Sequence, residues 1–286
     1  MVEPVGFDVF MERALYGPDG FYATGRGAGR RGADFITSPE VGPLFGAVIA
    51  NALRGAEVVI EAGAGRGALR DAVLLAAPTP LEYITVEFGD PWPDVDADVV
   101  IANELLDNLP CKIVEHTAEG WREVMVAGDA FVLGGVVDFA ADAPVGSRLP
   151  WHTTAQLWVE RACLSADRVV LFDYGTATTA ELVGRDWLRT YREHGRGADA
   201  LADPGSQDIT VDVAFDQLNP DEVTTQADWL RAHGIDALVD AARATWTERA
   251  AIGDLEALKA RSRVSEADAL LDPDGLGGFL VAEYVP

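Results

Sequence analysis

The hydrophobic positions of the chain follow two periods that alternate along its length. A continuous apolar run of β-branched residues occupies 58–60, and mostly apolar runs follow at 81–86, 97–102 and 168–172. Such runs are typical of parallel strands that are buried on both faces. Stretches with helical spacing lie between them, at 66–76 and 153–164. The alternation of strand and helix predicts an α/β fold built on a doubly wound parallel sheet.

Two helices are predicted before the first strand. Residues 5–16 carry apolar side chains at helical spacing, which gives the helix one buried face. A second helix is expected to begin with Ser38 as its N-cap and Pro39 at its first helical position, and to run to about Arg54. Glu40 then lies near the positive end of this helix, where a carboxylate is favourable.

The pattern changes after residue 110. Short alternating stretches joined by glycine turns predict an antiparallel insertion over residues 111–150. A loop-rich region follows, and helices are expected at 225–234, 236–251, 254–261 and 265–271, before a last strand within 277–285. We therefore expect one domain over residues 1–286, with an N-terminal region (1–55), the insertion (111–150) and a substrate-side region (176–272).

The charge of the chain limits its partners. The formal net charge is −25 and the pI is near 4.3. So acidic a chain repels phosphate backbones and anionic lipids, so nucleic acid and membranes are not expected partners. A basic peptide or protein is the partner that this charge favours, whereas the oligomeric state is left open.

The remaining composition indicates a reduced, metal-free protein. Cys111 and Cys163 form neither a metal-ligand spacing nor a disulfide framework, and the four histidines are scattered. The N-terminus carries acidic residues where a signal peptide has a basic region, and no apolar run approaches the roughly 20 residues that span a bilayer. We expect no metal site and a cytoplasmic location.

A glycine-rich turn follows the first strand and precedes a helix. Read as Gly63-Ala64-Gly65-Arg66-Gly67-Ala68, it fits the dinucleotide pattern GxGxxG/A. Read from Glu61, it fits the ExGxGxG turn of class I methyltransferases. The acid two residues before the first glycine favours the second interpretation, because its carboxylate can face the methionine end of S-adenosylmethionine. A purely structural turn is the remaining alternative.

Two further polar groups close the neighbouring strands. Glu87 follows the second strand, where a carboxylate can accept hydrogen bonds from ribose hydroxyls. Asn103 follows the third strand at the same edge of the sheet. Both are predicted to lie on the cofactor side.

Glu104 and Asp107 are the candidate catalytic residues. They are three positions apart, so a helical turn would place both carboxylates on one face. Two carboxylates directed at one point suit a guanidinium, which carries five donors and stays charged. The alternative is that they are acids favoured by the start of a helix.

Several ordered motifs together resemble one family. The chain is similar to the MidA-like family of class I S-adenosylmethionine-dependent methyltransferases through the following segments: Phe10-Met11-Glu12-Arg13-Ala14-Leu15-Tyr16 with Gly20-Phe21-Tyr22, Gly32-Ala33-Asp34-Phe35-Ile36-Thr37-Ser38-Pro39-Glu40, Leu44-Phe45-Gly46, Glu61-Ala62-Gly63-Ala64-Gly65, Asn103-Glu104-Leu105-Leu106-Asp107-Asn108-Leu109-Pro110, Asp173-Tyr174-Gly175, Tyr191-Arg192-Glu193-His194, and Pro204-Gly205-Ser206-Gln207-Asp208-Ile209-Thr210.

The resemblance implies a fold, a reaction and a set of site residues. The fold is a seven-stranded methyltransferase sheet with an added substrate-side region, and the reaction is N-methylation of an arginine on a protein by S-adenosylmethionine. The implied cofactor-binding residues are Ser38, Glu61, Gly63, Ala64, Gly65, Gly67, Glu87 and Asn103. The implied substrate-side residues are Asp173, Tyr174, Tyr191, His194 and Asp208, with Glu104 and Asp107 clamping the guanidinium.

Two other functions are compatible with the sequence. The GxGxxA pattern allows an NAD-dependent oxidoreductase. The second-strand acid, Glu87, is followed by Asn103 after only 16 positions, where family members have a longer helix-containing segment. That shortening favours a non-catalytic assembly or binding module that has kept the fold.

Overall fold

The computed structural model describes residues 3–23, 37–192, 195–197 and 199–286. The chain forms two compact units, each built from separate chain segments. The first comprises Met1–Asp34, Glu104–Leu164 and Asp173–Pro220, and is called the insertion unit below. The second comprises Phe35–Asn103, Ser165–Phe172 and Asp221–Pro286, and is called the sheet unit.

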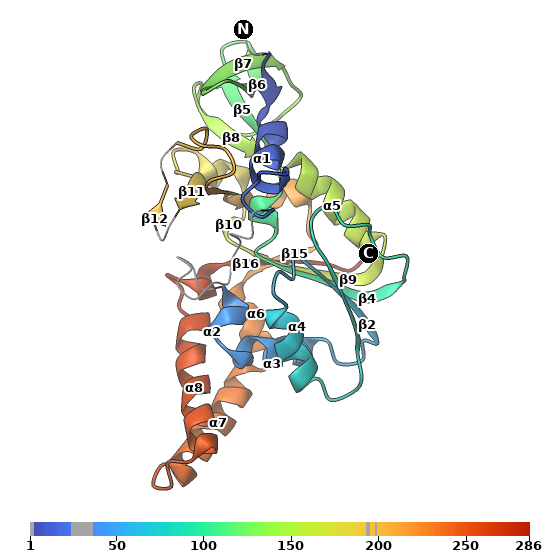
Figure 1. Cartoon of the computed structure of the whole chain (residues 1–286), viewed down its shortest axis with the longest axis vertical. Helices are drawn as coiled ribbons and strands as arrows, with labels where there is room; N and C mark the ends of the chain where they lie inside the picture. Colours follow the sequence, from blue (N-terminus) through green and yellow to red (C-terminus); the bar gives the residue numbers. More distant parts are fainter. Residues whose placement is uncertain (1–2, 24–36, 193–194, 198) are drawn as a thin grey trace. The chain divides into compact units, whose positions relative to one another are not determined.

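The sheet unit contains a six-stranded sheet and its helices (Figure 1). Its strands are β2 (Val58–Ala62), β3 (Glu82–Val86), β4 (Ala97–Asn103), β9 (Ala166–Asp173, whose last residue begins the insertion unit), β15 (Glu222–Thr225) and β16 (Leu280–Tyr284). Its helices are α2 (Ser38–Val41), α3 (Pro43–Ala52), α4 (Ala68–Ala76), α6 (Gln226–Ala232), α7 (Ile235–Arg249), α8 (Leu255–Leu270) and the 3-10 turn η4 (Leu276–Gly278).

The order of the strands is β15-β16-β9-β4-β2-β3. β3, β2, β4 and β9 are parallel, and β15 pairs antiparallel with β16. The chain leaves β2 for β3 on one side and then continues with β4 on the other side of β2. This reversal is a topological switch point, and ligands of open α/β sheets bind outside the strand ends at such a point.

The sheet has six strands where the resemblance implied seven. Residues 87–96, between β3 and β4, contain turns and bends but no strand, so β3 is the edge of the sheet. The short segment that the sequence showed between Glu87 and Asn103 is the physical reason. The prediction of an α/β fold with a parallel core is confirmed at this coarser level.

Side chains on both faces of β2, β4 and β9 are mostly buried, as their apolar sequences predicted. Val59, Ile101 and Phe172 join α3, α4, α6, α7 and α8 in one hydrophobic core. The alternate positions Ile60 and Val100 are also fully buried. Burial on both faces explains why these strands show no polar alternation.

The helix predicted over residues 38–54 is two helices. Its N-cap is Thr37 rather than Ser38, and the Thr37 N–H donates to Glu40 Oε2 at 3.3 Å. The break falls at Gly42, before Pro43.

Gly42 is required by a close approach from α8. A Cβ at Gly42 would lie 2.3 Å from the carboxyl carbon of Glu266. The buried Glu266 accepts a hydrogen bond from the Leu44 N–H at 2.9 Å, which caps the start of α3. A single helix with a side chain at position 42 would exclude this carboxylate.

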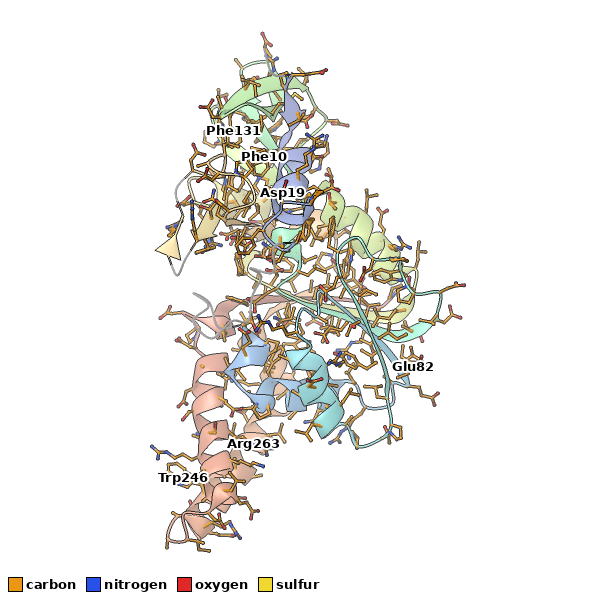
Figure 2. The ribbon with its side chains drawn as sticks, in the orientation of Figure 1. Phe10, Asp19, Glu82, Phe131, Trp246 and Arg263 are labelled. Carbon is orange, nitrogen blue, oxygen red and sulfur yellow. The ribbon has the colours of Figure 1, made fainter. Side chains whose placement is uncertain are left out.

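α7 and α8 form a helical hairpin that extends from the core (Figure 1). The sequence predicted two helices at 254–261 and 265–271, whereas α8 is continuous. No glycine or proline interrupts residues 262–264, so nothing in the backbone ends the helix there. Trp246 and Arg263 lie on this hairpin (Figure 2).

The insertion unit is built from short elements. These are β1 (Val5–Gly6), α1 (Phe7–Tyr16), η1 (Leu106–Asn108), β5 (Lys112–Thr117), β6 (Gly120–Ala127), β7 (Ala130–Val136), β8 (Arg148–Trp151), α5 (Thr153–Cys163), β10 (Gly175–Thr176), η2 (Thr179–Leu182), β11 (Leu188–Arg192), β12 (Gly195–Arg196), β13 (Asp208–Val211), β14 (Val213–Ala214) and η3 (Phe215–Leu218).

Residues 111–150 form an antiparallel sheet. β5 pairs with β6 and β8, and β6 also pairs with β7 and β1. A smaller sheet, β12-β11-β13, lies in the region that the sequence marked as loop-rich. Its strands are too short for their alternation to be distinguished from a loop.

α1 packs on this antiparallel sheet with the face that its spacing predicted. Phe7, Met11 and Leu15 are fully buried and join Ile113 and Val124 in a second core. The helix therefore presents its opposite face, with Glu12 and Arg13, to solvent.

No helix in the described ranges is both long and apolar enough to cross a bilayer.

We expect Phe172 to be the most sensitive position of the sheet-unit core. Its ring packs edge-on against Phe45 (5.4 Å between centroids) and Trp229 (4.9 Å). Phe172→Ala should lower the free energy of unfolding by about 3–5 kcal/mol, because it leaves a cavity between two aromatic rings. Urea denaturation measures this change. Leu75→Ala, at an 82% exposed position, is the control, and equal effects of the two variants would contradict the assignment.

Candidate functional site

The glycine turn of the sheet unit has the backbone of a ligand-binding corner. Gly63, Gly65 and Gly67 all have positive φ, at 71°, 52° and 76°. L-residues with a Cβ rarely adopt this region, so the three glycines are there for the backbone. A Cβ at Gly65 would meet no atom of the described residues within 4 Å, so that part of the chain leaves the space above the turn open. The half-buried Ala64 lies between these glycines.

Glu87 ties the end of β3 to this turn. Its Oε1 accepts the Gly65 N–H at 2.8 Å. Burial raises the pKa of Glu87, the Gly65 hydrogen bond opposes the rise, and the charge of Asp90 adds to it. The predicted ribose acid and the glycine turn are therefore in direct contact.

Glu61 is a buried carboxylate with spare hydrogen-bonding capacity. The residue is only 4% exposed, and its Oε2 has no hydrogen-bond partner among the residues that the structure describes. Burial raises its pKa to about 7, against the lowering influence of Tyr83 and Arg70. An unsatisfied buried oxygen two residues before the turn fits the cofactor interpretation, because a positively charged ligand group would satisfy it.

The positions of Ser38 and Asn103 bear differently on their predicted role in cofactor binding. Asn103 ends β4 and is half-buried. Ser38 is fully buried and its Oγ donates to Gln226 Oε1 at 3.0 Å, a contact between α2 and α6. The assignment of Ser38 to the cofactor therefore rests on the resemblance alone.

In the insertion unit, Asp173 holds the backbone turn that carries Asp107. Its side chain is fully buried and accepts three backbone N–H groups: Leu106 (2.8 Å) and Asp107 (3.2 Å) on Oδ2, and Tyr174 (2.9 Å) on Oδ1. Burial and the charges of Asp107 and Glu104 raise the pKa of Asp173.

Glu104 comes close to Asp173 through a geometry that its spacing of three positions from Asp107 did not predict. Asn103 pairs with Phe172 in the parallel β4–β9 ladder, so the residues that follow them, Glu104 and Asp173, emerge side by side. Glu104 has φ 52° and lies before η1, so it is not part of a helical turn with Asp107. The expected shared helical face is wrong. Strand register and left-handed backbone bring Glu104 and Asp107 to Asp173 instead.

Asp107 is buried and half satisfied. Its Oδ2 accepts the Tyr174 hydroxyl at 2.5 Å, whereas Oδ1 has no hydrogen-bond partner in the described part of the chain. Burial raises the pKa of Asp107 to about 6, and Tyr174 and the positive charge of Arg189 lower it. The side chain thus has one oxygen available to a cationic group.

Asp208 belongs to a second network around η1. Asn108 Nδ2 donates to Asp208 Oδ1 at 3.1 Å, and the Tyr22 hydroxyl lies 3.2 Å from the same oxygen. Tyr22 also donates to Asn108 Oδ1 at 3.0 Å. Burial and the charge of Asp107 raise the pKa of Asp208 to about 7. Tyr191 pairs with Asp208 across β11 and β13, whereas His194 lies outside the described residues.

Three residues of this site were not singled out from the sequence. Tyr22 and Asn108 hold η1, and Arg189 lies over the ring of Tyr174, 4.8 Å from its centroid, in an ion pair with Asp212. Tyr22 and Asn108 lie within the motifs quoted above, which was a usable signal. No local pattern marked Arg189.

The switch point, the positive-φ glycines and the strand-end acids define an α/β protein that binds a nucleotide-like ligand. Residues 77–235 match the family described as "Putative S-adenosyl-L-methionine-dependent methyltransferase". The chain belongs to this family, and it is an S-adenosylmethionine-dependent methyltransferase. The resemblance to class I methyltransferases is confirmed, and the NAD alternative is set aside.

Curated relatives are named protein arginine methyltransferase NDUFAF7, mitochondrial. The chain is 25% identical to the Danio rerio protein over 82% of this chain and 74% of that one. It is 24% identical to the Xenopus tropicalis protein over 74% of this chain and 66% of that one. The latter match spans just under two thirds of the relative.

Solved structures show the same fold. A Burkholderia thailandensis protein bound to S-adenosyl-homocysteine has a TM-score of 0.81 and 27% identity, covering 99% of this chain and 88% of its own. A native structure from the same organism has a TM-score of 0.79 and 25% identity, covering 99% of this chain and 87% of its own.

We expect Gly65→Ala to weaken binding of S-adenosylhomocysteine by at least about tenfold in titration calorimetry. The new Cβ would occupy the open space above the turn, and a positive φ costs an alanine about 1 kcal/mol. Gly55→Ala is a matched control, because Gly55 also has positive φ (94°) and open surroundings. Equal affinity losses in both variants would show that backbone strain, not the ligand site, is responsible.

Proposed function

We propose that this methyltransferase N-methylates an arginine side chain of a protein. The observation that carries the proposal is the carboxylate cluster of Glu104, Asp107 and Asp173. Two of these acids are buried and have raised pKa values, and Asp107 Oδ1 is unpaired. Such a cluster is relieved by a cation, and an acceptor side chain that carries one supplies it.

A guanidinium fits the cluster better than other cations. It is planar, remains charged at any ordinary pH, and offers several donors to carboxylates that approach from different directions. A lysine ammonium has to lose its proton before it can act as a nucleophile, and a ring of acids opposes that loss. The relatives named as arginine methyltransferases support the same choice.

The acids also have a chemical role. The guanidinium has no free lone pair at neutral pH, so one of its protons must leave as the nitrogen is methylated. Glu104 is half-buried and is the acid we assign to orient the guanidinium and accept this proton. Asp107 stabilises the positive charge of the guanidinium, while Tyr174 and Asp173 fix the position of Asp107 by hydrogen bonds.

The residues of the sheet unit fit the cofactor. We infer that Glu61 Oε2 faces the methionine ammonium and that Glu87 Oε2 accepts from the ribose, since its Oε1 already holds Gly65. Gly63, Ala64, Gly65, Gly67 and Asn103 complete the site. When bound, S-adenosylmethionine supplies an activated methyl group and leaves as S-adenosylhomocysteine.

The remaining expectations are part of the same proposal. The substrate is a basic protein, and neither nucleic acid nor a membrane surface is a partner, because the chain carries a net charge of −25. We place the protein in the cytoplasm. The oligomeric state stays open.

We expect Glu104→Gln to retain affinity for S-adenosylhomocysteine and to lower kcat by about 10²–10⁴-fold, because the amide cannot accept the proton. Methyl transfer to an arginine peptide, followed by mass spectrometry, measures kcat. The control is Glu119→Gln, at a side chain that is 78% exposed. Unchanged turnover of the Glu104 variant would remove this residue from the chemistry.

We also expect the affinity for an arginine peptide to fall as the pH falls below about 6. A bound cation favours ionised Asp107, whose pKa in the free protein is about 6, so binding must displace a proton below that pH. The dissociation constant should rise about tenfold between pH 7 and pH 5, by fluorescence anisotropy without cofactor.

Other charges around Asp107 shape this dependence. Asp173 and Asp208 add negative charge and Arg189 adds positive charge. Asp107→Asn should bind weakly at every pH and lose the step near pH 6, whereas Asp129→Asn, in an exposed turn, should match the wild type. A step that persists in the Asp107 variant would assign it to another acid.

A further inference from the structure

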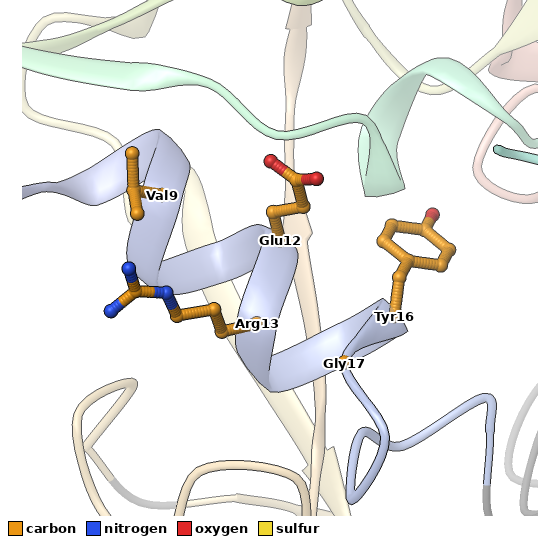
Figure 3. Close-up of a pocket in the computed structure, with 5 residues that line it drawn as sticks. All are labelled: Val9, Glu12, Arg13, Tyr16 and Gly17. Carbon is orange, nitrogen blue, oxygen red and sulfur yellow. The ribbon is translucent and has the colours of Figure 1, made fainter.

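The solvent face of α1 carries a pocket that the site described above does not include. Its volume is about 330 Å³, and it is lined by Val9, Glu12, Arg13, Tyr16 and Gly17 (Figure 3). This size is at the lower end of pockets that hold small ligands or single side chains.

The lining residues share one face because of their helical spacing. Positions 9, 12, 13 and 16 are three or four apart, so they lie together on the side opposite the buried Met11 and Leu15. Glu12 and Arg13 are exposed, and Val9 is 37% exposed, which leaves an apolar surface beside the charges.

The pocket is adjacent to the turn that carries Asp107. Tyr16 lines the pocket, and its hydroxyl donates to the Asn108 carbonyl at 3.1 Å. Asn108 follows Asp107 in η1. Tyr16 therefore joins the pocket to the turn that carries Asp107.

The charges of the pocket are not symmetrical. Figure 3 shows the Glu12 carboxylate on the same side of α1 as the Tyr16 ring, whereas the Arg13 guanidinium points away from both. The pocket thus places an anion and an aromatic ring together on the Tyr16 side, while the cation of its lining, Arg13, extends to the other side. Long basic side chains match such a surface, because they place an apolar stem on the ring and a charge at the carboxylate.

We propose that this pocket binds a lysine or arginine of the acceptor protein that lies within a few residues of the methylated arginine. The proposal rests on the proposed function, and it names a sequence preference that the carboxylate cluster alone does not give. An extended peptide advances roughly 3.3–3.6 Å per residue, so a residue a few positions from the methylated arginine can reach a pocket that Tyr16 joins to the same turn.

Glu12 is exposed, so the effect on affinity is modest. Exposed ion pairs of this kind change binding by about two- to fivefold. Glu12→Lys changes the charge at this position by two, whereas Glu12→Gln changes it by one. The lysine variant should therefore change the affinity for a basic peptide more. Glu12→Gln is kept as a second variant that introduces no new cation.

The experiment compares two labelled peptides that contain the same central arginine. One has lysines at the flanking positions and the other has glutamates. Anisotropy measures binding, and mass spectrometry measures methyl transfer. We expect the wild type to bind the lysine peptide more tightly, Glu12→Gln to reduce the difference about two- to fivefold, and Glu12→Lys to reverse its direction at this position.

Asp19→Lys is the matched control. Asp19 is an exposed acid of the same unit, two residues beyond Gly17, and it does not line the pocket (Figure 2). This variant changes the net charge by the same amount, so it should keep the preference for lysine. Equal effects of Glu12→Lys and Asp19→Lys would mean that only the net charge matters, and would overturn the proposal.

The two proposals fail separately. Efficient arginine methylation with no dependence on Glu12 would reject the pocket and leave the function standing. A preference for the lysine peptide that depends on Glu12, without methyl transfer to arginine, would reject the function and retain the pocket as a binding site for basic side chains.

Discussion

The turn that carries the proposed acceptor residues depends on one buried carboxylate, Asp173. Asp173 accepts backbone N–H groups from Leu106, Asp107 and Tyr174, and in this way it holds the turn that carries both candidate acids. Three hydrogen bonds to backbone stabilise its charge, yet burial and the neighbouring carboxylates oppose it, so the pKa of Asp173 is raised. The turn is therefore ordered by a carboxylate whose surroundings hold too little positive charge to balance its own.

This shortage links the geometry to the reaction. Burial raises the pKa of Asp107, and burial together with the charge of Asp107 raises the pKa of Asp208. Groups that are costly to keep ionised are typical of functional sites, because a ligand of opposite charge recovers the cost on binding. Arg189 offsets part of the charge near Asp107, but it is also paired with Asp212. The sheet unit shows the same feature on a smaller scale at Glu61, whose unpaired oxygen precedes the glycine turn.

The prediction from sequence succeeded where the signal was local. The apolar runs at 81–86, 97–102 and 168–172 became β3, β4 and β9 with small shifts at their ends, and α1 and α4 formed where their spacing placed them. It failed where a distant residue decided the local structure. The predicted helix over 38–54 is interrupted at the Gly42–Pro43 pair, and Glu266, more than 200 positions later, occupies the space beside Gly42 and caps α3. The network of Tyr22 joins residues 86 and 186 positions away, so no window of sequence contains it.

The sequence by itself determined the parallel sheet, the glycine turn and the acids at the strand ends, because hydrophobic periodicity and backbone freedom are properties of neighbouring residues. It also determined the family, through motifs that occur in a set order. Only the tertiary structure decided how the acids meet. Glu104 reaches Asp173 through the register of two parallel strands and a left-handed backbone, not through a helical turn. Burial, which sets the pKa of Asp107 and the unpaired state of its Oδ1, exists only once distant segments have packed around it.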